Sequence, residues 1–172
     1  MIANTSGGQL LNRVAHMDIF DLCDCLEDNS IDMILCDLPY GITACSWDTV
    51  IPFEPMWECF KRVIKPRGAV VLTASQPFTS KLVMSNLEWF RSEWVWDKVL
   101  AVGFQISAVR QMMQHENVLV FGYPSVIFYP QKQKRAKHRW SGGGGGSVLL
   151  ANGYRSTKRT LTEVSPKSII KV

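Results

Sequence analysis

Apolar positions along the first 130 residues recur at two spacings, one typical of strands and the other of helices. Near-continuous apolar runs at 31–36 and 69–74 predict two strands, and the second reads as a strand covered on both faces. Between them, the apolar residues of 53–64 follow a pair of prolines and recur at helical spacing, which predicts a helix. The sequence Lys-Pro-Arg-Gly at 65–68 predicts its end.

Weaker patterns predict the remaining elements. In chain order these are a short strand at 13–17, a helix capped by Asp18, a helix carrying Phe78 and Leu82, and strands at 89–96, 116–121 and 126–129. Residues 99–114 read as a long irregular connection, a kind of segment that is usually functional. Strands that alternate with helices in this way predict an α/β layered sheet.

Beyond Pro130 the periodic pattern stops. Residues 141–147 read Ser-Gly-Gly-Gly-Gly-Gly-Ser, a composition that buries nothing and stays flexible. We therefore expect a domain at 1–130 and a basic, Gly-rich, partly flexible tail at 131–172. Whether the glycine run is a natural loop or an artificial linker is left open by the sequence.

The net charge of +4 conceals an asymmetry between these two parts. Residues 131–172 contain ten Lys or Arg and one Glu, a net charge of +9, whereas residues 1–130 have a net charge of −5. A basic tail on an acidic domain suits a polyanionic partner, although a solvated tail without a specific role has the same composition. The predicted DNA contacts in the tail are Lys132, Lys134, Arg135, Lys137 and Arg139.

Several classes of protein are disfavoured. No apolar run reaches the roughly 18 residues of a membrane span, and the first residues do not resemble a secretory signal. The five cysteines match no paired zinc-binding pattern, so no metal site is expected. We expect all five to be reduced thiols in a cytoplasmic protein.

The candidate chemistry lies in Asp37-Leu38-Pro39-Tyr40, directly after the strand at 31–36. Ligands of open α/β sheets bind at the carboxyl ends of strands. The Asp37 carboxylate and the carbonyl of Leu38 offer two acceptors for the two N–H groups of an exocyclic amine. Hydrogen bonds to both favour a pyramidal nitrogen and so return electron density to that nitrogen. Pro39 fixes the backbone there, and Tyr40 offers a ring on which a flipped base stacks. An ordinary turn is the alternative interpretation, because Asp and Pro are common in turns.

This tetrapeptide resembles the Asp-Pro-Pro-Tyr motif of DNA amino-methyltransferases, specifically the permuted branch in which the catalytic motif precedes the cofactor motif. Further resembling segments are 28–32, 47–48, the helix with Trp57, 64–68, 72–78, 93–98 and 115–121, so the resemblance covers roughly residues 12–130. Residues 165–170 resemble the strand that follows the target-recognition region.

The resemblance implies a Rossmann-like sheet with flanking helices, S-adenosylmethionine as cofactor and double-stranded DNA as partner, in a phage or bacterial restriction–modification setting. Aspartate at the first position of the motif favours adenine N6 over cytosine N4. By the same resemblance, Asp18 and Asp37 lie near the cofactor, although Asp18 serves equally well as a helix cap.

Two departures from the family pattern stand out. The first proline of the motif is Leu38, and the Thr-Gln-Lys-Pro segment and Gly-rich Phe-x-Gly-x-Gly-like cofactor loop are missing from these residues. Gly142–Gly146 is no substitute, because no apolar strand precedes it. We therefore expect a partial sheet that lacks the cofactor-loop strand, in which 31–36 has an unpaired edge or pairs with a non-native segment. The chain is then a truncated enzyme that binds the cofactor weakly or not at all. The alternatives are a non-catalytic nucleic-acid-binding remnant, cytosine-N4 specificity and, less favoured, methylation of RNA or of a protein amide.

Overall fold

The computed structural model describes residues 11–140 and 160–171, with the backbone alone at 135–140 and 160–162. The chain divides into two compact units. Unit 1 runs to Ile127 and takes in Ser168–Val172, whereas unit 2 is Phe128–Lys167.

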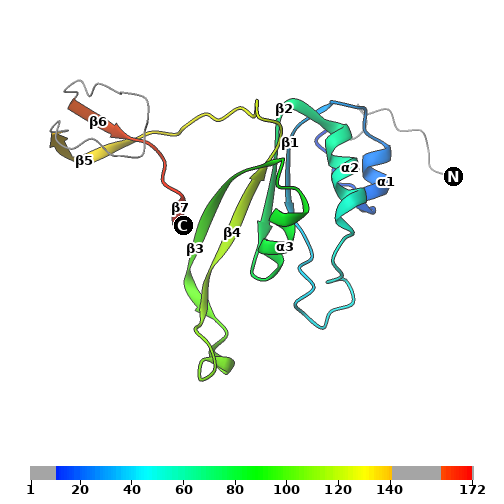
Figure 1. Ribbon diagram of the computed structural model, residues 1–172, viewed down its shortest axis with the longest axis horizontal. Coiled ribbons are helices and arrows are strands. Elements are labelled where there is room, and N and C mark those ends of the chain that lie inside the picture. Colours follow the sequence, from blue (N-terminus) through cyan, green and yellow to red (C-terminus); the bar gives the residue numbers. More distant parts are fainter. Residues whose placement is uncertain (1–10, 141–159, 172) are drawn as a thin grey trace. The chain divides into compact units, whose positions relative to one another are not determined.

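Unit 1 is a five-stranded sheet with helices packed against it. Its elements are α1 (Ile19–Asp24), β1 (Ile31–Asp37), α2 (Phe53–Val63), β2 (Ile64–Ala74), α3 (Phe78–Ser85), β3 (Phe90–Val102), the 3-10 helix η2 (Phe104–Ile106), β4 (Met113–Phe121) and β7 (Ile169–Lys171). The strand order is β1-β2-β4-β3-β7 (Figure 1). The pairs β1–β2 and β3–β7 are parallel, and the other two are antiparallel. The predicted α/β sheet with flanking helices is confirmed.

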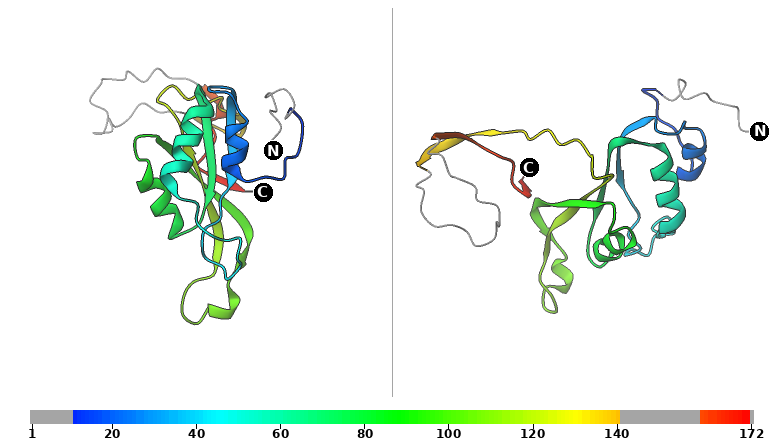
Figure 2. Two further views of the ribbon diagram at one scale, coloured as in Figure 1. Left: turned by 90° about the vertical axis from the view of Figure 1, so that its right-hand side faces the viewer. Right: turned by 45° about the horizontal axis from the view of Figure 1, so that its top comes forward.

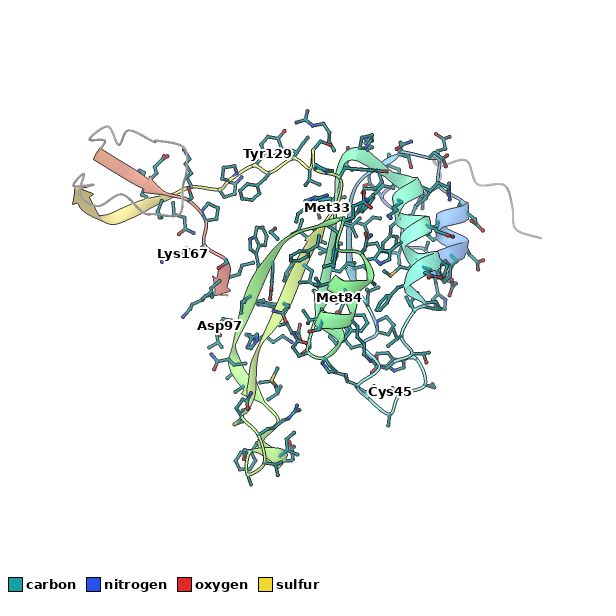
Figure 3. The ribbon with its side chains drawn as sticks, in the orientation of Figure 1. Met33, Cys45, Met84, Asp97, Tyr129 and Lys167 are labelled. Atoms are coloured by element: carbon teal, nitrogen blue, oxygen red, sulfur yellow. A yellow bond between two sulfur atoms is a disulfide. The ribbon has the colours of Figure 1, made fainter. Side chains whose placement is uncertain are left out.

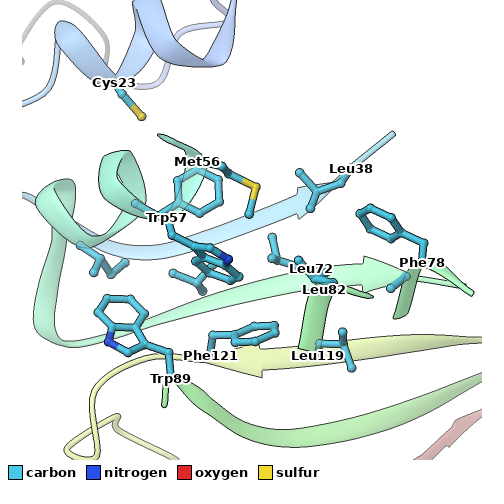
Figure 4. Packing of buried hydrophobic residues seen from close by; sticks show 14 residues of the cluster. Cys23, Leu38, Met56, Trp57, Leu72, Phe78, Leu82, Trp89, Leu119 and Phe121 are labelled. Carbon is cyan, nitrogen blue, oxygen red and sulfur yellow. The ribbon is translucent and has the colours of Figure 1, made fainter. Parts of the chain in front are cut away.

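The helices lie on one face of this sheet (Figure 2). Val70 and Leu72 of β2 and Leu119 and Phe121 of β4 point to that face and are completely buried. Figure 4 shows them packed under side chains of α2 and α3, among them Met56. The hydrophobic core is therefore a single layer between the helices and one face of the sheet.

The opposite face of the sheet is more open. Met33 and Leu35 of β1 are 55% and 65% exposed, and the label in Figure 3 marks Met33. The alternate residues of β2, including Val71, are only partly buried. The prediction that β2 is covered on both faces is therefore wrong, because the helices of unit 1 pack on one face. As expected, β1 is an edge strand with β2 as its one partner among the described strands.

The local sequence explains how α2 leads into β2. The helix ends at Val63, and Ile64 already has extended dihedral angles. The predicted end of the helix at 65–68 is therefore confirmed to within two residues, and residues 65–68 themselves belong to β2. Gly68 allows the two strands to approach, because a Cβ atom there would lie 2.8 Å from the carbonyl oxygen of Asp32 in β1.

Three other predicted elements differ from the structure. Residues 13–17 and 126–129 form no strand, and neither segment pairs with any strand of the described residues. β3 continues to Val102 and pairs with Met113 of β4, so the predicted irregular connection at 99–114 is largely a hairpin. Its turn is reduced to residues 103–112.

Unit 2 contains β5 (Gln133–Trp140) and β6 (Thr160–Val164), which pair antiparallel. The hydrophobic pattern does not predict these two strands, whose sequences are mostly polar. The glycines at 142–146 lie outside the described residues. After unit 2 the chain returns to unit 1, where β7 pairs with β3 and Val95 N donates to Ser168 O at 2.7 Å.

Cys23 and Cys59 form a disulfide between α1 and α2, with Cα atoms 6.2 Å apart. The expectation of five reduced thiols is wrong for this pair, because packing of the two helices brings the two residues together. Cys25, Cys36 and Cys45 are free. Within the described residues, no His, Cys, Asp or Glu cluster is suited to hold a metal ion. None of the helices described there is long and apolar enough to cross a membrane.

Candidate functional site

The candidate site is built where β1 ends. Asp37 is the last residue of β1, and its register partner in the parallel strand β2 is Thr73. Residues that are opposite each other in a sheet point to the same face, so the two side chains meet. Tyr40 returns to this pair from the loop that follows β1.

Three side chains form one hydrogen-bonded group. Thr73 Oγ1 donates to Asp37 Oδ1, and Tyr40 Oη lies 2.8 Å from the same carboxylate oxygen and 2.9 Å from Thr73 Oγ1. Asp37 is exposed, and no other described side chain or backbone N–H binds its second oxygen, Oδ2. The carboxylate is therefore fixed through Oδ1 and presents Oδ2 as a free acceptor.

The ring of Tyr40 is held as firmly as its hydroxyl. It stacks on Phe78, the first residue of α3, with ring centroids 5.2 Å apart and an interplanar angle of 24°. Burial, together with the neighbouring Asp37 charge, raises the Tyr40 pKa above its ordinary value, so the hydroxyl remains a donor. Phe78 therefore supports one face of the ring, and the ring as a whole is only partly buried.

Leu38 has a structural role besides its carbonyl group. Its side chain is buried in the core, on the helix-covered side of the sheet (Figure 4). This packing fixes the start of the loop where a family motif has proline. Pro39 has a fixed φ and restricts the backbone of the residue before it, Leu38. The departure at Leu38 therefore leaves the backbone constrained.

The loop after Tyr40 is organised by Asp48. Its carboxylate accepts hydrogen bonds from the backbone N–H groups of Gly41, Ile42 and Thr43 at 2.7–2.9 Å, and from the Thr43 hydroxyl at 2.8 Å. These bonds, the one from Gly41 first, lower the Asp48 pKa to about 2. Gly41 has φ of +69°, and a Cβ atom there would lie 2.8 Å from Val50.

Sequence reasoning missed the roles of Thr73, Phe78 and Asp48. The signal for Thr73 lies only in strand register, which depends on pairing between distant segments. Asp48 had a local signal, because an aspartate a few residues after a Gly-containing turn is suited to bind the N–H groups of that turn.

The other predicted site residues do not join this group of side chains. Asp18 caps α1 by accepting from Phe20 N at 2.8 Å, and its role near a cofactor stays a prediction. Lys132 Nζ lies 3.8 Å from Glu163 Oε2, and Lys134 is exposed in β5. Arg135, Lys137 and Arg139 also lie on β5, where the backbone alone is described.

No family model matches the chain. Among solved structures, the crystal structure of the M1.HpyAVI–SAM complex aligns with a TM-score of 0.52 and 18% identity, covering 71% of this chain and 61% of that chain. The PvuII DNA methyltransferase, described as cytosine-N4-specific, aligns with a TM-score of 0.52 and 11% identity, covering 91% of this chain and 55% of that chain. The chain shares their fold. It spans less than two thirds of the length of either one.

The described residues supply only part of a pocket for S-adenosylmethionine. Small-molecule sites bury most of a ligand's surface in a concave cavity. Here Asp37 and Tyr40 lie at the end of an edge strand whose outer side has no described partner. No described glycine-rich turn leads from a strand into a helix. The described residues therefore do not form a complete site for that cofactor.

Proposed function

We propose that this chain carries the base-binding, catalytic part of a DNA amino-methyltransferase that uses S-adenosylmethionine and modifies adenine N6. The observation that carries the proposal is the free Oδ2 of Asp37, held by Thr73 and Tyr40 at the carboxyl end of a strand. The shared fold with the M1.HpyAVI–SAM complex and the PvuII enzyme supports it.

The geometry suits an exocyclic amine. Asp37 Oδ2 accepts one N–H of the target amine and the carbonyl of Leu38 accepts the other, so the nitrogen becomes pyramidal and its lone pair is available. The ring of Tyr40 stacks on the flipped base, an interaction of about 1–3 kcal/mol. When bound, the cofactor would supply the methyl group from its sulfonium centre, with cleavage of the S–C bond to that group, and would leave as a neutral thioether. Asp37 stabilises the positive charge that develops on the nitrogen, and the methylated nitrogen then releases its proton to water.

Adenine is the proposed target because aspartate begins the motif. A cytosine-N4-specific enzyme shares the fold, so the fold alone does not separate the two bases. The identity of the methylated nucleoside is therefore part of the test.

The test measures transfer of a labelled methyl group from S-adenosylmethionine to DNA, followed by nucleoside analysis. Because the cofactor loop is missing from these residues, the test uses a full-length version in which the chain is joined to such a loop. We expect this version to form N6-methyladenine and its Asp37→Ala variant to lose at least about 100-fold in rate, since the acceptor aimed at the nitrogen is removed. Asp32→Ala is the matched control, because Asp32 is an exposed carboxylate of the same strand, paired with Lys65. Equal rates in Asp37→Ala and the control contradict the proposal, and so does a product other than a methylated base.

A non-catalytic DNA-binding function is the second candidate. It is favoured by the open edge of β1 and by the basic composition of unit 2, including Lys132 and Lys134. If unit 2 binds DNA phosphates, log affinity falls linearly with log salt, by about 0.9 for each phosphate contact. DNA binding with that slope and no methyl transfer supports this candidate. A cytoplasmic location suits either function and stays a prediction.

A further inference from the structure

The hairpin of β3 and β4 extends well past the rest of the sheet. Asp37, Thr73, Val118 and Trp94 are register partners in one row across β1, β2, β4 and β3. β3 continues from Trp94 to Val102, and Val102 pairs with Met113, five residues along β4 from Val118. The paired strands therefore extend roughly 16 Å beyond this row, at about 3.3 Å per residue. β1, β2 and β3 run in the same direction, so this extension leaves the sheet at the edge where Asp37 lies (Figure 1).

The tip of this hairpin, residues 98–114, exposes large apolar side chains. Leu100, Phe104 and Val109 are 78%, 76% and 88% exposed. The turn is nevertheless ordered by backbone hydrogen bonds, for example from Ile106 N to Gly103 O at 3.1 Å. The tip therefore presents apolar groups in a defined shape, away from the core of unit 1.

The charge of the tip narrows the choice of partner. No acidic residue occurs between Asp97 and Glu116, whereas this stretch contains Lys98, Arg110 and several glutamines. Lys98 pairs with Glu116, and Arg110 is exposed in the turn. Apolar groups together with an unopposed arginine suit a duplex, in which the charged backbone flanks apolar base faces and methyl groups.

We propose that the hairpin tip inserts into a groove of the DNA duplex beside the target base. A two-stranded ribbon fits the major groove, and inserted apolar side chains are known to part stacked bases. Leu100 and Phe104 pack against base edges, and Arg110 binds a phosphate. The inference rests on the proposed function, which gives DNA as the partner. The place of the hairpin beside the target base follows from Asp37, because both lie at the same end of the sheet.

The central experiment compares two double variants. Leu100→Ser with Phe104→Ser removes the apolar tip. The control, Met84→Ser with Leu87→Ser, removes apolar groups that are 68% and 56% exposed at and just after α3; Figure 3 labels Met84. Fluorescence anisotropy measures affinity for a short labelled duplex of mixed sequence. We expect the tip variant to bind at least about tenfold more weakly and the control to stay within about twofold of the wild type. Equal affinities overturn the proposal.

Two further measurements keep this test separate from the test of catalysis. A photoreactive phenylalanine analogue at position 104 should crosslink to the duplex, and Arg110→Ala should reduce the salt slope by about one. Crosslinking and weakened binding without methyl transfer support the hairpin and contradict catalysis. Methyl transfer without crosslinking or loss of affinity contradicts the hairpin alone. Loss of a dimer in the tip variant, seen by sedimentation with unchanged DNA affinity, assigns the tip to a second copy and overturns the proposal.

Discussion

Two neighbouring strands, β1 and β2, have similar apolar sequences but different surroundings. β2 pairs with β1 on one side and β4 on the other, and its residues Val70, Leu72 and Ala74 are completely buried. β1 pairs with β2 alone among the described strands, and it exposes Met33 and Leu35. An apolar run therefore indicates a strand without indicating how many neighbours that strand has.

The difference in burial between β1 and β2 also gives the two strands different roles at the candidate site. The exposed strand carries Asp37, the proposed acceptor, and the buried strand carries Thr73, which donates a hydrogen bond to that carboxylate. An open strand alone would leave its terminal side chain mobile. The Asp37 carboxylate is held in position by the central strand β2 and is open to solvent because β1 is an edge strand. An acceptor that must be both fixed and accessible needs both strands.

The largest expected effect is a difference in the free energy of unfolding between a variant in β2 and a variant in β1. Leu72→Ala in β2 should lower the free energy of unfolding by about 2–5 kcal/mol, because it opens a cavity in the core. Leu35→Ala in β1 should change it by at most about 0.5 kcal/mol, because that side chain is largely in solvent. Chemical denaturation measures both. Similar losses in the two variants would show that β1 is covered in solution.

The next effect concerns the support that β2 gives to Asp37. Thr73→Val keeps the shape of the side chain and removes its donor, so methyl transfer should fall about tenfold, equivalent to the roughly 1.4 kcal/mol of one charge-assisted hydrogen bond. Thr73→Ser restores the donor and should restore the rate. Initial-rate measurements test this pair, and equal rates in both variants would assign Thr73 to packing.

A smaller effect concerns the loop that follows β1. The folded-state pKa of Asp48, about 2, lies below its unfolded value of about 3.8. The charged form therefore stabilises the fold above pH 3.8, and this contribution is lost as pH falls toward 2. Asp48→Asn should weaken the pH dependence of unfolding in that window. It should also speed amide exchange at Gly41–Thr43, and unchanged exchange there would contradict the role given to Asp48.

The smallest effect is expected where the two strands begin. Lys65 Nζ lies 2.7 Å from Asp32 Oδ1, and the Asp32 side chain is 84% exposed. Exposed ion pairs contribute about 0–1 kcal/mol, so a double-mutant cycle of Asp32→Ala and Lys65→Ala should give a coupling below about 1 kcal/mol that salt weakens. A larger, salt-insensitive coupling would mean that this end of β1 is buried in solution.

The sequence predicts the parts of the fold that local pattern determines. The apolar run at 31–36 and the Asp-Leu-Pro-Tyr segment after it are contiguous, so the strand and the position of Asp37 are correctly predicted. Thr73, the hairpin beyond Asp97 and the disulfide of Cys23 with Cys59 depend on pairing between distant segments, which no local pattern reports. β5 was missed because its sequence is dominated by basic residues, with no apolar alternation to indicate a strand.

The last strand, β7, brings the chain back to pair with β3 of unit 1. This topology has a consequence for the evolution of the protein. Unit 2, Phe128–Lys167, is preceded and followed in the chain by segments of unit 1. It is therefore an insertion into the sheet domain. Recombination can lengthen, shorten or replace such a segment while every strand pairing of unit 1, and the position of Asp37, stays the same. The chain can thus acquire new binding preferences without rebuilding its chemistry.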